Sequence, residues 1–106
     1  MGNETIVALS TPQGIGAIGV IRLSGKNAIK LTADHLGSNF KLAEANTVHF
    51  GRFNVGARIL DEVVATVFRA PKSYTGENVV ELSFHGSSYI LNEALDALIA
   101  SGAQLA

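Results

Sequence analysis

The sequence predicts an α+β domain, in which a mainly antiparallel or mixed β-sheet carries two helices packed on one side. Three observations favour this class. Short β-branched and apolar runs lie near both ends of the chain, a hairpin pattern occupies the centre, and two separate segments have helical periodicity. The chain of 106 residues is long enough for one core and too short for a second. We therefore expect one two-layer domain over residues 1–106.

Composition and charge narrow the classes of function. Hydrophobic residues make up 47% of the chain and charged residues 16%, which leaves some apolar surface for a partner. The net charge of −1, without a local Lys/Arg cluster, gives no general attraction to nucleic acid, so we expect any RNA to be held mainly by other segments. The chain has no cysteine, and its N-terminal apolar run is too short for a signal or membrane segment. We expect a cytoplasmic protein that does not bind membranes.

The first strand is expected at residues 5–9, and a loop follows it. Residues 14–19 then match G-x-G-x-x-G, a spacing that binds a dinucleotide pyrophosphate when a helix comes next. Residues 17–23 are instead rich in Ile and Val and lack a helical cap, so they predict a second strand. A dinucleotide-dependent enzyme is thus a weaker hypothesis, which requires residues 17–24 to be helical.

The second strand carries Arg22 on the same face as the apolar Ile18 and Val20. A guanidinium in that place indicates a carboxylate, a ligand or solvent as its partner, and an Arg snorkelling from a strand end is the alternative.

No P-loop is present. Gly19 and Gly25-Lys26 resemble one, but their spacing is one residue too long, and Asn27 replaces the hydroxyl residue that would hold magnesium. We therefore predict that this domain alone does not hydrolyse GTP.

The middle of the chain predicts a helix, a linker and a hairpin. Ser24 can cap a helix over residues 26–36 that Gly37 ends. Residues 38–45 are expected to be irregular. Two β-runs follow at residues 46–53 and 57–69, and the second is apolar enough on both faces to be a central strand. His35 and His49 have no neighbour at metal-ligand spacing, so we interpret them as structural or surface histidines.

The most informative stretch is PKSYTGENVVELSFHG, residues 71–86. Its TGEN segment predicts a turn, and the strand that follows alternates between an apolar and a polar face. The apolar face holds Val80, Leu82 and Phe84, and the polar face holds Val79, Glu81, Ser83 and His85.

The C-terminal part predicts a helix capped by Ser87 or Ser88 and extending to about Ala100. Its expected buried stripe is Leu91, Ala94, Leu95, Leu98 and Ile99. Gly102 ends the helix, and the last residues resemble the beginning of another strand.

Several segments together resemble the N-terminal domain of the MnmE (TrmE) family of tRNA-modifying GTPases. They are TIVALSTPQGIGAIGVIRLSG at residues 5–25, the Leu60-Asp61 step, and PKSYTGENVVELSFHGS at residues 71–87. The sequence departs from the family pattern in the first loop, at Gln13 and Ile15, and at Ser87-Ser88.

The resemblance implies a domain that homodimerises and binds a tetrahydrofolate derivative, 5-formyl- or 5,10-methylene-tetrahydrofolate. The longer protein would add a helical domain and a GTPase domain that binds GTP, Mg²⁺ and K⁺. With the flavoprotein MnmG (GidA), it would add a carboxymethylaminomethyl or aminomethyl group to carbon 5 of the wobble uridine in tRNA. The family's folate contacts fall on Arg22 and Glu81, while a contacting Lys and a C-terminal cysteine motif would lie past Ala106.

The chemistry of these two side chains agrees with the resemblance. A reduced pterin presents two parallel N–H donors that the Glu81 carboxylate can accept together, and Arg22 can donate to the pterin carbonyl or to the glutamate tail. His85 shares the face of Glu81 and can approach the same ligand or bond to the Gly86 turn; we assign it no proton transfer. Alternatively, Arg22 and Glu81 form an internal ion pair or lie apart, and the domain is a structural dimerisation module that binds no small molecule.

Overall fold

The computed structural model describes residues 4–10, 18–73 and 76–106, and these form a mixed six-stranded sheet with two α-helices. The expected α+β class is confirmed. The strands are β1 (Ile6–Leu9), β2 (Ile18–Ser24), β3 (Thr47–Val55), β4 (Arg58–Phe68), β5 (Val79–His85) and β6 (Gln104–Leu105). Their order in the sheet is β3-β4-β5-β2-β1-β6, and every neighbouring pair is antiparallel except β1 and β6.

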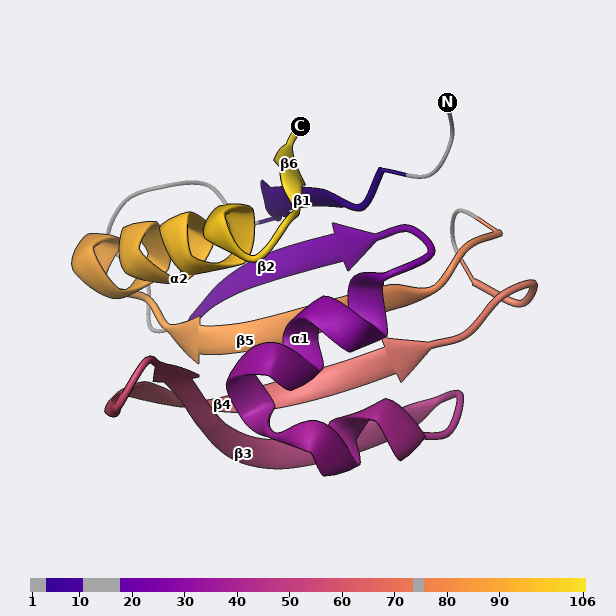
Figure 1. The fold of residues 1–106 in the computed structure, drawn as a ribbon, viewed down its shortest axis with the longest axis horizontal. Helices are drawn as coiled ribbons and strands as arrows, with labels where there is room; N and C mark the ends of the chain where they lie inside the picture. The colour runs from indigo at the N-terminus through magenta and orange to yellow at the C-terminus, as the bar shows by residue number, and fades with distance from the viewer. Residues whose placement is uncertain (1–3, 11–17, 74–75) are drawn as a thin grey trace.

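Helices α1 (Ala28–Leu36) and α2 (Ser88–Ala100) lie side by side over the same face of the sheet (Figure 1). The core fills the space between the two layers, because every second side chain of the central strands points towards the helices. Its largest fully buried apolar side chains are Phe53, Phe84, Ile21, Leu23, Leu82, Leu98 and Val7. We call this the covered face of the sheet, and the opposite one the open face.

The two helices begin differently. The Ser87 hydroxyl accepts a hydrogen bond from the Ile90 backbone N–H at 3.3 Å, which confirms the predicted cap of α2. The predicted cap of α1 is wrong, because Ser24 ends strand β2 and the helix begins only at Ala28. The backbone N–H of Asn27 instead donates to the hydroxyl of Thr5, at 3.1 Å, and so finds a partner outside the helix.

The expected linker at residues 38–45 contains a short 3₁₀ helix, η1 (Ser38–Leu42), that buries the Phe40 side chain. In α2, the predicted stripe is buried at Leu91, Ala94 and Leu98, whereas Leu95 is only partly buried, Ile99 is exposed and Ala97 is buried instead. The hairpin, the interior position of β4 and the final strand β6 all agree with the sequence-based expectations.

Gly19 explains part of the three-glycine pattern by packing. It lies within strand β2 on the covered face, and a Cβ placed there would come within 2.5 Å of the Leu91 Cδ1 in helix α2. Because residues 18–24 form a strand, the helical condition of the dinucleotide hypothesis fails and that hypothesis is wrong. The earlier part of the pattern and the first loop, at residues 11–17, lie outside the described residues, as do Tyr74 and Thr75 of the predicted turn.

The two predicted structural histidines have structural partners. In His35, Nδ1 lies 2.9 Å from the Asn54 carbonyl oxygen and Nε2 lies 2.9 Å from the Ser101 hydroxyl, so the ring links α1 to β3 and to the end of α2. His49 contacts the Thr47 hydroxyl and the edge of a buried aromatic ring. None of the described helices combines the length and apolar character that crossing a membrane requires.

Candidate functional site

Arg22 and Glu81 lie opposite each other on the neighbouring strands β2 and β5. The Nε and Nη2 atoms of Arg22 both donate to the same carboxylate oxygen, Glu81 Oε2, at 2.9 and 2.6 Å. The two side chains remain 42% and 22% exposed. The structure therefore brings both predicted site residues together as the ion pair that was one of the alternatives, on a surface that a ligand can reach.

The ion pair stands on the open face of the sheet, among apolar side chains that the helices do not cover. On neighbouring strands of this face lie Ile18, Val20, Val48, Phe50 and Val64. Phe50 is 75% exposed, which is unusual for a phenylalanine unless another molecule covers it. Val79 departs from the predicted alternation, because it is fully buried although it shares the parity of Glu81.

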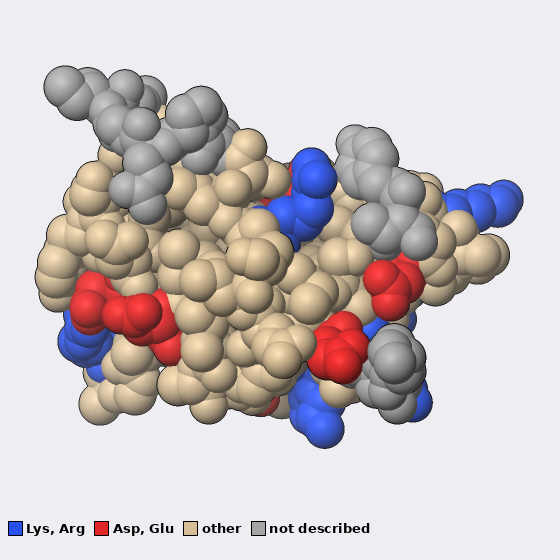
Figure 2. All heavy atoms as spheres, turned by 90° about the horizontal axis from the view of Figure 1, so that it is seen from above, with Lys and Arg blue, Asp and Glu red and all other residues tan. Residues whose placement is uncertain are grey.

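The side of the molecule drawn in Figure 2 presents no continuous basic surface among the described residues. Its Lys and Arg side chains form separate small groups, with uncharged and acidic surface between them (Figure 2). Together with the net charge of −1, this distribution gives the viewed side no footprint for a nucleic-acid backbone.

A second Arg–Glu ion pair lies away from the open face. Arg58, at the start of β4, donates to Glu93 on helix α2. The hydrogen bond to Glu93 raises the pKa of Arg58 above its ordinary value. This pair links the hairpin to the helix layer.

Of two cavities in the structure, one lies near the ion pair and the other lies away from it. One of about 310 Å³ lies on the open face beside the ion pair's strands, and its lining includes Ile18, Phe50, Val64 and Ser83. A larger one, of about 430 Å³, lies against α1 and β6 and includes neither Arg22 nor Glu81. In the described parts of the chain, no three His, Asp or Glu side chains are arranged to hold a metal ion.

His85 has a different partner from the one expected. It lies on β5 four residues after Glu81, about 13 Å along an extended strand, so it does not adjoin the ion pair. Its ring bonds to Asp61 of strand β4, and not to the Gly86 turn. Sequence reasoning missed this contact, although the Leu60-Asp61 step was part of the family resemblance.

Comparison with known protein families gives a match over residues 5–106, to the family described as GTP-binding protein TrmE N-terminus. Similar proteins include the tRNA modification GTPase MnmE of Cytophaga hutchinsonii, 54% identical over 95% of this chain and 22% of the relative. The MnmE of Christiangramia forsetii is 52% identical over 92% of this chain and 21% of the relative. The MnmE of Streptococcus thermophilus is 44% identical over 97% of this chain and 23% of the relative. The chain thus spans about a fifth of the length of these relatives.

Proposed function

The chain belongs to the TrmE N-terminus family of GTP-binding proteins, and on that premise we propose that it is a folate-binding and dimerising domain. Residues 1–106 would form the N-terminal domain of a tRNA-modifying GTPase. The observation that carries the proposal is the Arg22–Glu81 pair, a partly exposed carboxylate and guanidinium on an uncovered and partly apolar sheet face.

The geometry of the pair suits a reduced pterin. Arg22 occupies only Oε2 of Glu81, and Oε1 accepts no hydrogen bond from the residues that the structure describes. A pterin N–H can therefore bond to Oε1 while the ion pair persists. If both oxygens of Glu81 accept from the two parallel N–H donors of the pterin, Arg22 would release one of its two bonds to Oε2. Its donors would then turn to the pterin carbonyl.

Dimerisation is supported by the composition of the open face. Phe50 and Val48 on strand β3 and Ile18 on strand β2 are all more than half exposed. A monomer gains nothing from keeping such side chains in water, whereas a second copy can bury them.

The activity of the longer protein is proposed from the relatives alone. They are named tRNA modification GTPases, and this chain has no P-loop of its own. GTP, Mg²⁺ and K⁺ would bind in a GTPase domain, and tRNA would be contacted mainly outside these residues. The partner flavoprotein would be MnmG (GidA), and the product an aminomethyl or carboxymethylaminomethyl group on carbon 5 of wobble uridine.

Calorimetric titration with 5-formyltetrahydrofolate tests the proposed site. We expect Glu81→Ala to weaken binding by about 1.5–3 kcal/mol, the loss typical of a hydrogen bond to a charged group. Glu93→Ala is the matched control, because it breaks the second Arg–Glu pair on the helix side and should leave the affinity unchanged. Equal affinities for the wild type and Glu81→Ala would remove Glu81 from the site.

A structural dimerisation module is the second candidate, and it too is favoured by the apolar open face. In that case Arg22 and Glu81 serve only as a cross-strand pair. Dimerisation in sedimentation experiments, without folate binding by either the chain or the longer protein, would favour this candidate over the first.

A further inference from the structure

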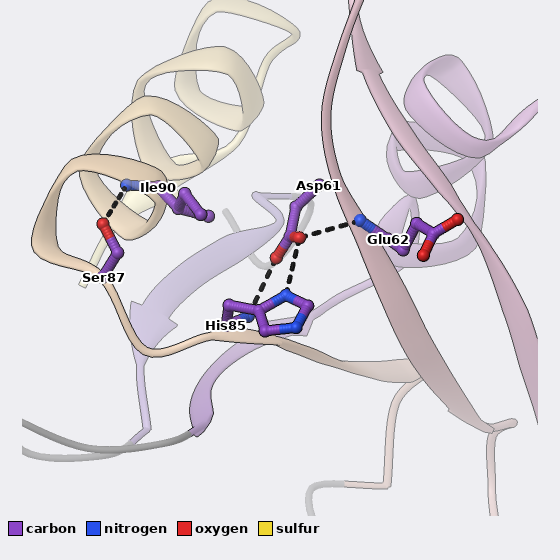
Figure 3. Close-up of polar contacts among 5 residues, drawn as sticks. All are labelled: Asp61, Glu62, His85, Ser87 and Ile90. Atoms are coloured by element: carbon purple, nitrogen blue, oxygen red, sulfur yellow. Dashed lines mark hydrogen bonds and ion pairs between the residues drawn. The ribbon is translucent and has the colours of Figure 1, made fainter.

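The Asp61 carboxylate of strand β4 accepts hydrogen bonds from its neighbour on the same strand and from the end of strand β5. Its side chain is only 9% exposed. Its Oδ1 accepts from the Glu62 backbone N–H at 2.9 Å and lies 2.7 Å from Nδ1 of His85, while its Oδ2 accepts from the His85 backbone N–H at 2.8 Å (Figure 3). The carboxylate therefore fixes both the backbone and the ring of His85.

This contact determines the tautomer of His85. An ionised carboxylate only accepts hydrogen bonds, so Nδ1 keeps the proton and its N–H donates a hydrogen bond to Asp61 Oδ1. In the neutral ring, Nε2 is then a hydrogen-bond acceptor. The His85 side chain is 72% exposed, and Figure 3 shows its second nitrogen on the side of the ring away from Asp61. A ligand can reach this nitrogen.

His85 also lines the open-face cavity of about 310 Å³. The other lining residues are Ile18, Phe50, Glu62, Val64, Ser83 and Phe84. The cavity thus combines apolar walls with an exposed aromatic ring, which suits a flat aromatic group. Glu62 makes it unsuitable for the carboxylate tail of a folate, because two like charges would lie close together.

We propose that His85, positioned by Asp61, binds the aminobenzoyl part of the folate through Nε2, a proposal that rests on the folate-binding function above. In 5-formyltetrahydrofolate, the secondary amine that joins the pterin to the benzoyl ring donates its N–H to Nε2, and the ring lies against Phe50. The 5,10-methylene form has no N–H at this nitrogen and cannot make the bond. A folate is elongated, and Glu81 and His85 lie about 13 Å apart along β5 on the same face, so the pterin occupies the first position and the ring the second.

The first test compares whole and partial ligands by titration. His85→Ala should weaken 5-formyltetrahydrofolate binding about fivefold, the loss of a neutral hydrogen bond, and leave the binding of 6-methyltetrahydropterin unchanged. Glu81→Ala should weaken both ligands. His49→Ala is the control, since that ring lies on the same hairpin but bonds to Thr47. If His85→Ala binds the whole folate as the wild type does, the inference is overturned while the folate function stands.

The second test measures, without any ligand, whether Asp61 positions the His85 ring. In Asp61→Ala, no side-chain oxygen accepts from Nδ1 of His85, so the preference for the Nδ1–H form should be lost and the exposed ring should return to the tautomer mixture of a free histidine, in which the Nε2–H form predominates. Imidazole ¹⁵N chemical shifts of the neutral ring distinguish the two tautomers, and we expect an Nδ1–H form in the wild type and a mainly Nε2–H form in Asp61→Ala. Identical shifts in both proteins would overturn the positioning role. Failure of the wild type to bind any folate species would overturn the proposed function and, with it, the ligand assigned to His85.

Discussion

The two faces of the sheet differ in how their apolar side chains are used. On the covered face, Ile21, Leu82 and Phe53 have no exposed surface, because the helices pack against them. On the open face, Phe50 and Ile18 stay mostly exposed, and an ion pair stands among them. The covered face accounts for the fold, whereas the open face carries apolar surface that the fold does not need. The difference points to the open face as the place of function.

The largest expected effect comes from two phenylalanines of strand β3. Phe53→Ala should lower the free energy of unfolding by about 3–5 kcal/mol, because it leaves a cavity in the core. Phe50→Ala, on the open face of the same strand, should change it by less than about 1 kcal/mol. Urea denaturation measures both, at a protein concentration at which sedimentation shows the chain to be monomeric, because a second copy would bury Phe50. Similar losses of unfolding free energy would show that the two faces are packed equally well. They would contradict the claim that the covered face alone accounts for the fold.

An intermediate effect is expected where helix α2 approaches strand β2. Gly19→Ala should destabilise the protein by about 1–3 kcal/mol, since the added methyl group must displace Leu91. Gly51→Ala is the control in strand β3, where the nearest atom would lie 3.8 Å from the new Cβ. In thermal unfolding, the midpoint temperature of Gly19→Ala should lie well below that of Gly51→Ala. The reverse order would contradict the close approach of helix and sheet.

The smallest effect is expected at the N-terminus of helix α2. Ser87→Ala should cost about 1 kcal/mol, because the Ile90 backbone N–H loses its cap. Ser88→Ala, one residue later, should change stability by less than about 0.5 kcal/mol. Equal losses in denaturant unfolding would show that the Ser87 cap contributes nothing.

The sequence predicted the covered face better than the open one. Period-two alternation in residues 79–85 and the helical stripe of α2 follow from local rules, so strand, helix and core could be inferred. The order of the strands could not, because it depends on pairings between distant residues. The same holds for contacts such as that of Asp61 with His85, which join residues 24 positions apart. Arg22 and Glu81 were singled out from strand parity and the family resemblance, but only the register of β2 against β5 shows that they are opposite each other.

Methyl-resolved NMR during titration with 5-formyltetrahydrofolate tests the role of the open face most directly. If the account is correct, the methyl groups of Ile18, Val20 and Val64 shift as the ligand saturates the chain, and those of Val7 and Leu82 on the covered face do not. Saturable shifts confined to the covered face or the helices, with the open-face methyl groups unmoved, would contradict it.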